Sequence, residues 1–179
     1  TGYYAKASAD KVDTVLDVIS DIFLNSKLEG SAIDVERGVI IEEINMNRDA
    51  PARYIGSLFE KLLYGNQPAG WEVLGEKETI TSLERQTFVD YFNSHYVAGN
   101  TVIAVAGNID TESIKEKVGK YFSSARVGSA ISKPAVKEEQ SQPQALVYYK
   151  DTDQAHFCLG LRSFNMFDER KYALDVASS

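Results

Sequence analysis

The pattern of apolar and polar positions predicts a helix of about four to five turns over residues 31–47, SAIDVERGVIIEEINMN. Ser31 stands at an N-cap position, and Asp34 follows three residues later in a capping-box arrangement. The helix also carries an apolar run wide enough to be largely buried, formed by Val39, Ile40, Ile41 and Ile44. We expect the rest of the chain to be organised around this helix.

Two acidic residues, Glu36 and Glu43, interrupt the apolar pattern of this helix. Their spacing of seven residues places them within roughly 20° of each other on the helix face, with Ile40 between them. Carboxylates on an apolar face are costly unless something compensates them. A metal ion, another cation or solvent at the edge of the face would each suffice. Spacing alone leaves these alternatives open, because Glu42 shows that the same turn carries acid on more than one side.

The remaining pattern predicts both helices and strands. Helical spacing of apolar residues predicts further helices over residues 12–25, 53–64, 79–96, 111–122 and 168–177. Alternating or β-branched runs predict short strands over residues 3–7, 101–106, 145–149 and 156–161. Because the helices are grouped rather than strictly alternating with strands, the order predicts an α/β (α+β) fold with helices packed on a mixed sheet.

A change in composition suggests how the chain divides into domains. Residues 123–143 are rich in Ser, Lys, Glu, Gln and Pro, and they contain few large apolar residues. This composition is typical of a linker. We therefore expect one domain over residues 1–122, which lacks its first part, a linker over 123–143, and the beginning of a second domain over 144–179. The last piece is too small to fold alone.

Composition and charge narrow the classes of function. The chain has 179 residues, of which 44% are apolar and 25% charged, and its net charge is -7. An acidic balance argues against general binding to nucleic acid or anionic membranes. No apolar run is long enough to cross a membrane, and the first residues do not resemble a signal peptide. A single cysteine permits no intramolecular disulfide, which fits a reducing compartment.

Other candidate chemistry is sparse. The two histidines, His95 and His156, have no second His or Cys at metal-ligand spacing. We expect His95 to end a helix, His156 to pack within a strand, and the thiol of Cys158 to be buried. The 179 residues contain no HExxH, HxxEH, GxGxxG, Walker or GxSxG motif.

Several stretches, in this order and spacing, carry a resemblance to a known family. They are ERGVIIEEI, NRDAP, YGNQPAGWEVLG and FVDYFNSHYVAGNTVIAVAGNID. Together they resemble the insulinase, or pitrilysin, family of zinc peptidases, and most closely its processing-peptidase subgroup. The resemblance covers nearly the whole chain. It implies two homologous α/β domains joined by a linker, so that residues 144–179 would begin the second domain.

The resemblance also implies a zinc site on the helix over residues 31–47. Members of the family bind zinc through an HxxEH motif and a later glutamate in a pattern like E-x6-E. Carried over by position, Glu43 would be the zinc ligand, and Glu36 would support the site from the outer shell. The HxxEH motif, with its two histidines and its general-base glutamate, would lie before Thr1. We therefore expect this stretch alone to contain no catalytic residue, to bind no Zn²⁺ and to be inactive.

The implied function is that of a fragment of a zinc-dependent endopeptidase that hydrolyses unstructured peptides or presequences. The fragment could arise from proteolysis or truncation of an active enzyme. Alternatively, the parent could be a non-catalytic structural or partner subunit of the same fold. The resemblance implies a peptide substrate and a homodimer, a heterodimer or a second pair of domains, with no nucleic acid and no membrane. A bacterial cytoplasm or a mitochondrial matrix would fit.

Overall fold

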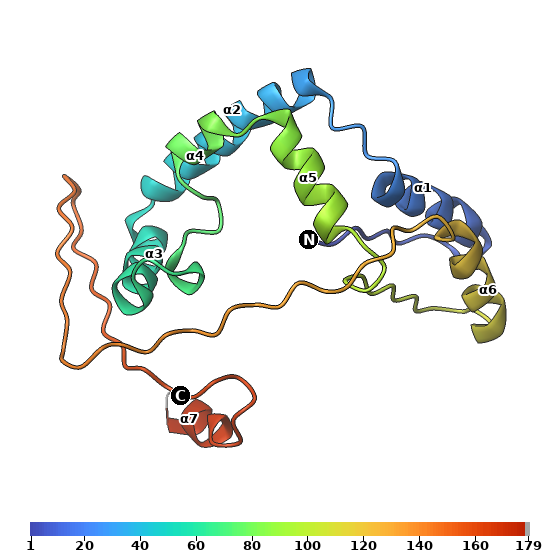
Figure 1. Cartoon of the computed structure of the whole chain (residues 1–179). Helices are drawn as coiled ribbons and strands as arrows, with labels where there is room; N and C mark the ends of the chain where they lie inside the picture. Colours follow the sequence, from blue (N-terminus) through green and yellow to red (C-terminus); the bar gives the residue numbers. More distant parts are fainter. Residues whose placement is uncertain (178–179) are drawn as a thin grey trace. The chain divides into compact units, whose positions relative to one another are not determined.

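The structure is a computed structural model that describes residues 1–177, and Figure 1 shows that its regular elements are helices. Seven α-helices and two 3₁₀ turns occur in the described residues: η1 (Ala9–Lys11), α1 (Val12–Leu24), α2 (Gly30–Arg48), α3 (Pro51–Tyr64), η2 (Pro68–Gly70), α4 (Lys77–Ser82), α5 (Arg85–His95), α6 (Thr111–Tyr121) and α7 (Lys171–Ala177). The predicted mixed sheet is absent, so the α/β (α+β) prediction was wrong for the described residues.

The four predicted strands explain this error. Within residues 1–177 the only bridge of β type joins Gly99 to Ser129, and it is isolated. An alternating apolar pattern favours an extended backbone, but a strand exists only where a second strand pairs with its N–H and C=O groups. None of the four segments, 3–7, 101–106, 145–149 and 156–161, has such a partner among the described residues.

The helix predictions were closer to the structure. The predicted helices that became α1, α2, α3 and α6 match within a few residues at each end. Asp110 caps α6, because its carboxylate accepts a hydrogen bond of 2.9 Å from the backbone N–H of Ser113. By contrast, α2 begins at Gly30, so Ser31 lies inside the helix and is not its N-cap.

The predicted helix over residues 79–96 is two helices. α4 ends at Ser82 and α5 begins at Arg85, with Glu84 in an extended conformation between them. The apolar periodicity continues across this break, so the sequence pattern does not reveal it. Backbone carbonyls at the end of α4 accept hydrogen bonds from a side chain of α2, as described below.

The chain divides into two compact units, and the division falls within α2. One unit comprises residues 1–39 and 78–133, and the other comprises residues 40–77 and 134–179, of which the last two lie outside the described residues. The predicted division into residues 1–122, 123–143 and 144–179 stays a prediction.

An aromatic core holds the first unit together. The Phe23 ring of α1 lies 5.7 Å from the ring of Tyr96 and 6.0 Å from that of Phe122, measured between centroids. Phe92 of α5 extends this cluster, with its ring 4.6 Å from that of Tyr96. An ion pair of 2.6 Å between Lys117 of α6 and Asp13 of α1 joins the two helices at the surface. These contacts are the helix-on-helix packing that an all-helical unit requires.

In the second unit, α2 ends at Arg48 and α3 begins at Pro51 after a short turn. Ile44 of α2 is the most buried side chain of the described residues, with 1% of its surface exposed. The rest of the apolar run on α2 is only partly covered, and Val39 is 45% exposed. The expectation that this run is largely buried therefore holds for Ile44 alone.

Candidate functional site

Glu36 and Glu43 lie on one continuous helix, α2, and both side chains are exposed to solvent. Ile40 lies between them and is half-buried. Helix geometry keeps the two carboxylates on one stripe, two turns apart. Because both side chains are exposed, neither carboxylate carries the cost of burial in an apolar core.

Neither Glu36 nor Glu43 has a hydrogen-bond or ion-pair partner among residues 1–177. Other acids of α2 are engaged. Asp34 pairs with Arg37 at 3.6 Å, and Glu42 accepts a hydrogen bond of 3.3 Å from the side-chain amide of Asn45. The stripe therefore carries two carboxylates whose oxygens are free to accept an external ligand. Glu42, adjacent in sequence, is engaged on a different face.

A complete metal site is not present in the part of the chain that the structure describes. No group of three or more His, Cys, Asp or Glu side chains gathers there in a way that could hold an ion. Zinc sites in proteins usually take three or four protein ligands. The chemistry of Glu43 fits one of them, because a carboxylate oxygen is an accepted zinc ligand. The assignments of Glu43 to zinc and of Glu36 to the outer shell stay predictions.

The histidines lie far from these carboxylates in sequence. His95 is the last residue of α5, as expected, and its ring stacks on Tyr91 with centroids 3.8 Å apart. Its Nδ1 lies 2.9 Å from Oγ of Ser94 and 3.1 Å from the backbone oxygen of Tyr91. These contacts give the ring a structural role at the end of the helix.

His156 and Cys158 differ from expectation. His156 is exposed rather than packed in a strand, and the thiol of Cys158 is exposed rather than buried. Both predictions assumed a paired strand with a covered face. Because no second strand pairs with this segment among the described residues, its backbone does not place either side chain under a covered sheet face.

A network of charged side chains lies at the C-terminal end of α2. The sequence pattern did not predict it. Arg48 donates a hydrogen bond of 2.6 Å to Glu76, and Nζ of Lys150 donates to the Arg48 backbone oxygen and to Oδ1 of Asp49, each at 2.8 Å. Burial opposes the charge of Arg48, but the bond to Glu76 and the nearby carboxylates outweigh it and raise the pKa of Arg48. The hydrogen bond and charge of Lys150 lower the pKa of Asp49. The pairs are separated by up to 102 residues, so no local pattern could reveal them.

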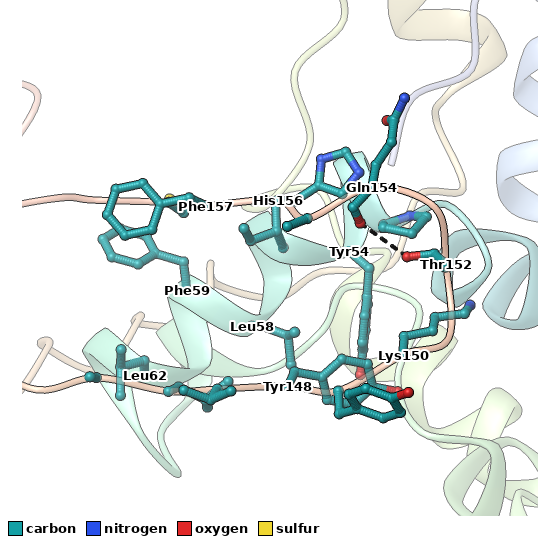
Figure 2. Close-up of a pocket in the computed structure, with 18 of the residues that line it drawn as sticks. Tyr54, Leu58, Phe59, Leu62, Tyr148, Lys150, Thr152, Gln154, His156 and Phe157 are labelled. Atoms are coloured by element: carbon teal, nitrogen blue, oxygen red, sulfur yellow. Dashed lines mark hydrogen bonds between the residues drawn. The ribbon is translucent and has the colours of Figure 1, made fainter.

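A cavity in the second unit lies between α3 and the segment over residues 144–160. Its volume is about 820 Å³. Figure 2 shows that the residues lining it include Tyr54 and Leu58 of α3, and Tyr148 and Phe157 of the segment. The rings of Tyr54 and Tyr148 meet edge to face with centroids 5.5 Å apart. The cavity is mainly apolar, and its polar lining includes Lys150, Asp153 and His156.

Comparison with known proteins identifies the family. A family model described as "Peptidase M16 inactive domain" matches residues 82–179, and one described as "Insulinase (Peptidase family M16)" matches residues 1–77. The chain belongs to the insulinase family, peptidase family M16. The resemblance noted in the sequence is thereby confirmed. The matched "inactive domain" covers more than half of the chain, including the segment that lines the cavity beside α3.

Curated relatives agree with this family. The chain is similar to the "Uncharacterized zinc protease YmxG" of Bacillus subtilis, with 35% identity over the whole chain and 43% of that protein. It is also similar to the "Uncharacterized zinc protease ML0855" of Mycobacterium leprae, with 29% identity over 98% of the chain and 40% of that protein. Similarity to the "Mitochondrial-processing peptidase subunit beta" of Caenorhabditis elegans reaches 32% over 73% of the chain and 28% of that protein. The chain therefore spans less than half the length of these relatives.

Solved structures support the fold alone. The peptidase M16 inactive domain from Pseudomonas fluorescens matches 73% of this chain and 31% of its own, with a TM-score of 0.65 and 17% identity. The periplasmic protease PqqL from Escherichia coli matches 74% of this chain and 15% of its own, with a TM-score of 0.62 and 20% identity. No helix within residues 1–177 is both long and apolar enough to cross a membrane.

Proposed function

We propose that the chain is part of a zinc-dependent endopeptidase in which Glu43 of α2 is a metal ligand and Glu36 supports the site from the outer shell. The observation that carries the proposal is the free state of these two carboxylates, which share one stripe of α2 while Asp34 and Glu42 are engaged elsewhere. Membership of family M16, and relatives named zinc proteases, select zinc as the ion.

The proposed chemistry is metal-assisted hydrolysis of a peptide bond. Bound zinc supplies a water of lowered pKa and polarises the scissile carbonyl. Within this chain the role of Glu43 is to hold the ion through one carboxylate oxygen, and the role of Glu36 is to orient the site. The two zinc histidines and the general-base glutamate belong to an HxxEH motif that we place in the same protein before Thr1. A chain with one ligand should bind zinc weakly, so residues 1–179 alone should be inactive.

The proposed substrates are unstructured peptides or presequences, and the proposed assembly is a dimer or a second pair of domains. This follows from the family and from a relative whose name includes "subunit beta". A bacterial cytoplasm, or a mitochondrial matrix, is the proposed location.

The test is Glu43→Gln in the full-length gene product, with Glu42→Gln as a matched control on the adjacent position. We expect Glu43→Gln to lose most of its bound zinc, measured by inductively coupled plasma mass spectrometry, and most peptidase activity. Glu36→Gln should weaken zinc binding about 10–100-fold, as is typical for outer-shell partners. Full zinc content in the Glu43→Gln protein would refute the ligand assignment. Equal losses of zinc in the Glu43→Gln and Glu42→Gln proteins would refute it as well.

A further inference from the structure

Arg37 of α2 donates hydrogen bonds to three backbone carbonyls at and just after the C-terminal end of α4. The guanidinium of Arg37 donates to the backbone oxygen of Ile80, to that of Thr81 at 3.2 Å and to that of Leu83 at 2.8 Å. Its side chain is only 21% exposed, although it carries a full charge. The lone carboxylate beside it, Asp34, is 3.6 Å away and largely exposed. The carbonyls are therefore the main partners of Arg37.

These carbonyls need a partner from outside their own helix. The last carbonyls of any helix have no intrahelical donor, and Ile80 and Thr81 belong to the last turn of α4. A guanidinium presents five N–H donors in a planar fork and can satisfy several carbonyls at once. A lysine ammonium presents its donors from a single nitrogen and cannot span the same set. The break between α4 and α5 is thus tied to one face of α2.

A second arginine fastens the loop that leads into α2. Arg85, at the start of α5, donates from Nε to the backbone oxygen of Leu28 at 2.7 Å and from its terminal nitrogen to that of Lys27 at 3.4 Å. Leu28 has a φ of 47°, a left-handed conformation that is uncommon for leucine. This contact joins the loop before α2 to Arg85, two residues after Leu83, which accepts a hydrogen bond from Arg37.

These contacts restrain how α2 is turned about its own axis. Arg37 follows Glu36 directly, so its side chain leaves the helix about 100° around the axis from Glu36. Holding the Arg37 face against Ile80, Thr81 and Leu83 therefore sets the direction in which Glu36 leaves the helix. We infer that Arg37 is a positioning residue for Glu36 of α2, acting through its bonds to the backbone carbonyls of Ile80, Thr81 and Leu83. The inference rests on the function proposed above for Glu36 and Glu43.

The experiment uses the full-length gene product loaded with Co²⁺ in place of zinc, because the visible absorption of Co²⁺ reports the geometry of its ligands. We expect Arg37→Gln to shift or broaden the Co²⁺ bands and to weaken zinc binding about 10–100-fold in a chelator competition. Arg37→Lys keeps the positive charge beside Asp34 but loses the fork, so it should behave like Arg37→Gln. Circular dichroism establishes that each protein retains its helices, and Arg37→Lys carries the test if Arg37→Gln does not fold.

Two controls separate the possible results. Asp34→Asn removes the ion pair and leaves the carbonyl bonds intact, so its Co²⁺ spectrum and zinc affinity should be those of the parent protein. Glu43→Gln in the same assay should lose the metal. If Glu43→Gln binds zinc normally, the proposed function fails. If Glu43→Gln loses the metal while folded Arg37→Lys keeps the parent spectrum and affinity, Arg37 has only a structural role and the inference alone fails.

Discussion

The aromatic core of the first unit and the apolar segment over residues 144–160 of the second unit contrast sharply. Both are rich in large apolar side chains, but Phe23 is 8% exposed and Phe157 is 85% exposed. A helix satisfies its own backbone hydrogen bonds and needs only to cover one face. An extended segment needs a partner strand for its backbone as well as a cover for its side chains. Apolar composition therefore becomes a core in the first case and a solvent-facing surface in the second.

The largest expected effect on stability comes from removing an aromatic ring of the first unit's core. Phe23→Ala should lower the free energy of unfolding by about 3–5 kcal/mol, because it deletes a buried ring and leaves a cavity. Phe157→Ala should change it by less than about 0.5 kcal/mol, as expected for an exposed side chain. Urea unfolding followed by circular dichroism measures both values. Equal losses in the two variants would show that the segment over residues 144–160 is part of a cooperative core.

Removing the cap of α6 should have a smaller effect in the first unit. Asp110→Ala deprives the backbone N–H of Ser113 of its acceptor, so it should cost about 1 kcal/mol. Asp153 lies in a bend of the segment over residues 144–160 of the second unit, where it caps no helix. Asp153→Ala is therefore the matched control. The difference between the two unfolding midpoints tests the cap, and an unchanged midpoint for Asp110→Ala would contradict it.

The edge-to-face contact between Tyr54 and Tyr148 tests whether the segment over residues 144–160 is held on α3 at all. A double-mutant cycle with Tyr54→Ala and Tyr148→Ala should give a coupling energy of about 0.5 kcal/mol, at the low end for aromatic pairs, because Tyr148 is 54% exposed. Additive effects of the two substitutions would mean that the rings do not interact in solution.

The smallest effect concerns a local charge pair in the second unit, near α7. The side-chain bond from Arg170, followed by its backbone N–H and its charge, lowers the pKa of Asp168 to about 2. Because the folded pKa is depressed, any stabilisation is present above the ordinary value of about 3.9 and is lost as the pH falls towards 2. Carbon-13 NMR titration of the carboxylate should show this low value. Arg170→Gln should return it most of the way, and an unchanged pKa in that variant would contradict the assigned cause.

Local sequence signals were reliable where the interactions that define an element are themselves local. The helical spacing of apolar residues located α1, α2, α3 and α6. Prediction failed where the deciding partner lies far along the chain. The continuous pattern over residues 79–96 hid the break at Glu84, and the strand predictions assumed partners that residues 1–177 do not supply.

For the candidate site, the amino-acid sequence by itself determined that Glu36 and Glu43 share one stripe of one helix, because helix geometry depends only on their spacing. It also carried the family resemblance that the comparisons confirmed. Only the tertiary structure decided that both carboxylates are exposed and unpaired, while Glu42 is bonded to Asn45. It alone placed Arg37 on the carbonyls of residues 80–83, because that contact joins groups more than 40 residues apart. Long-range contacts of this kind depend on how helices pack, and no pattern within a single helix encodes them.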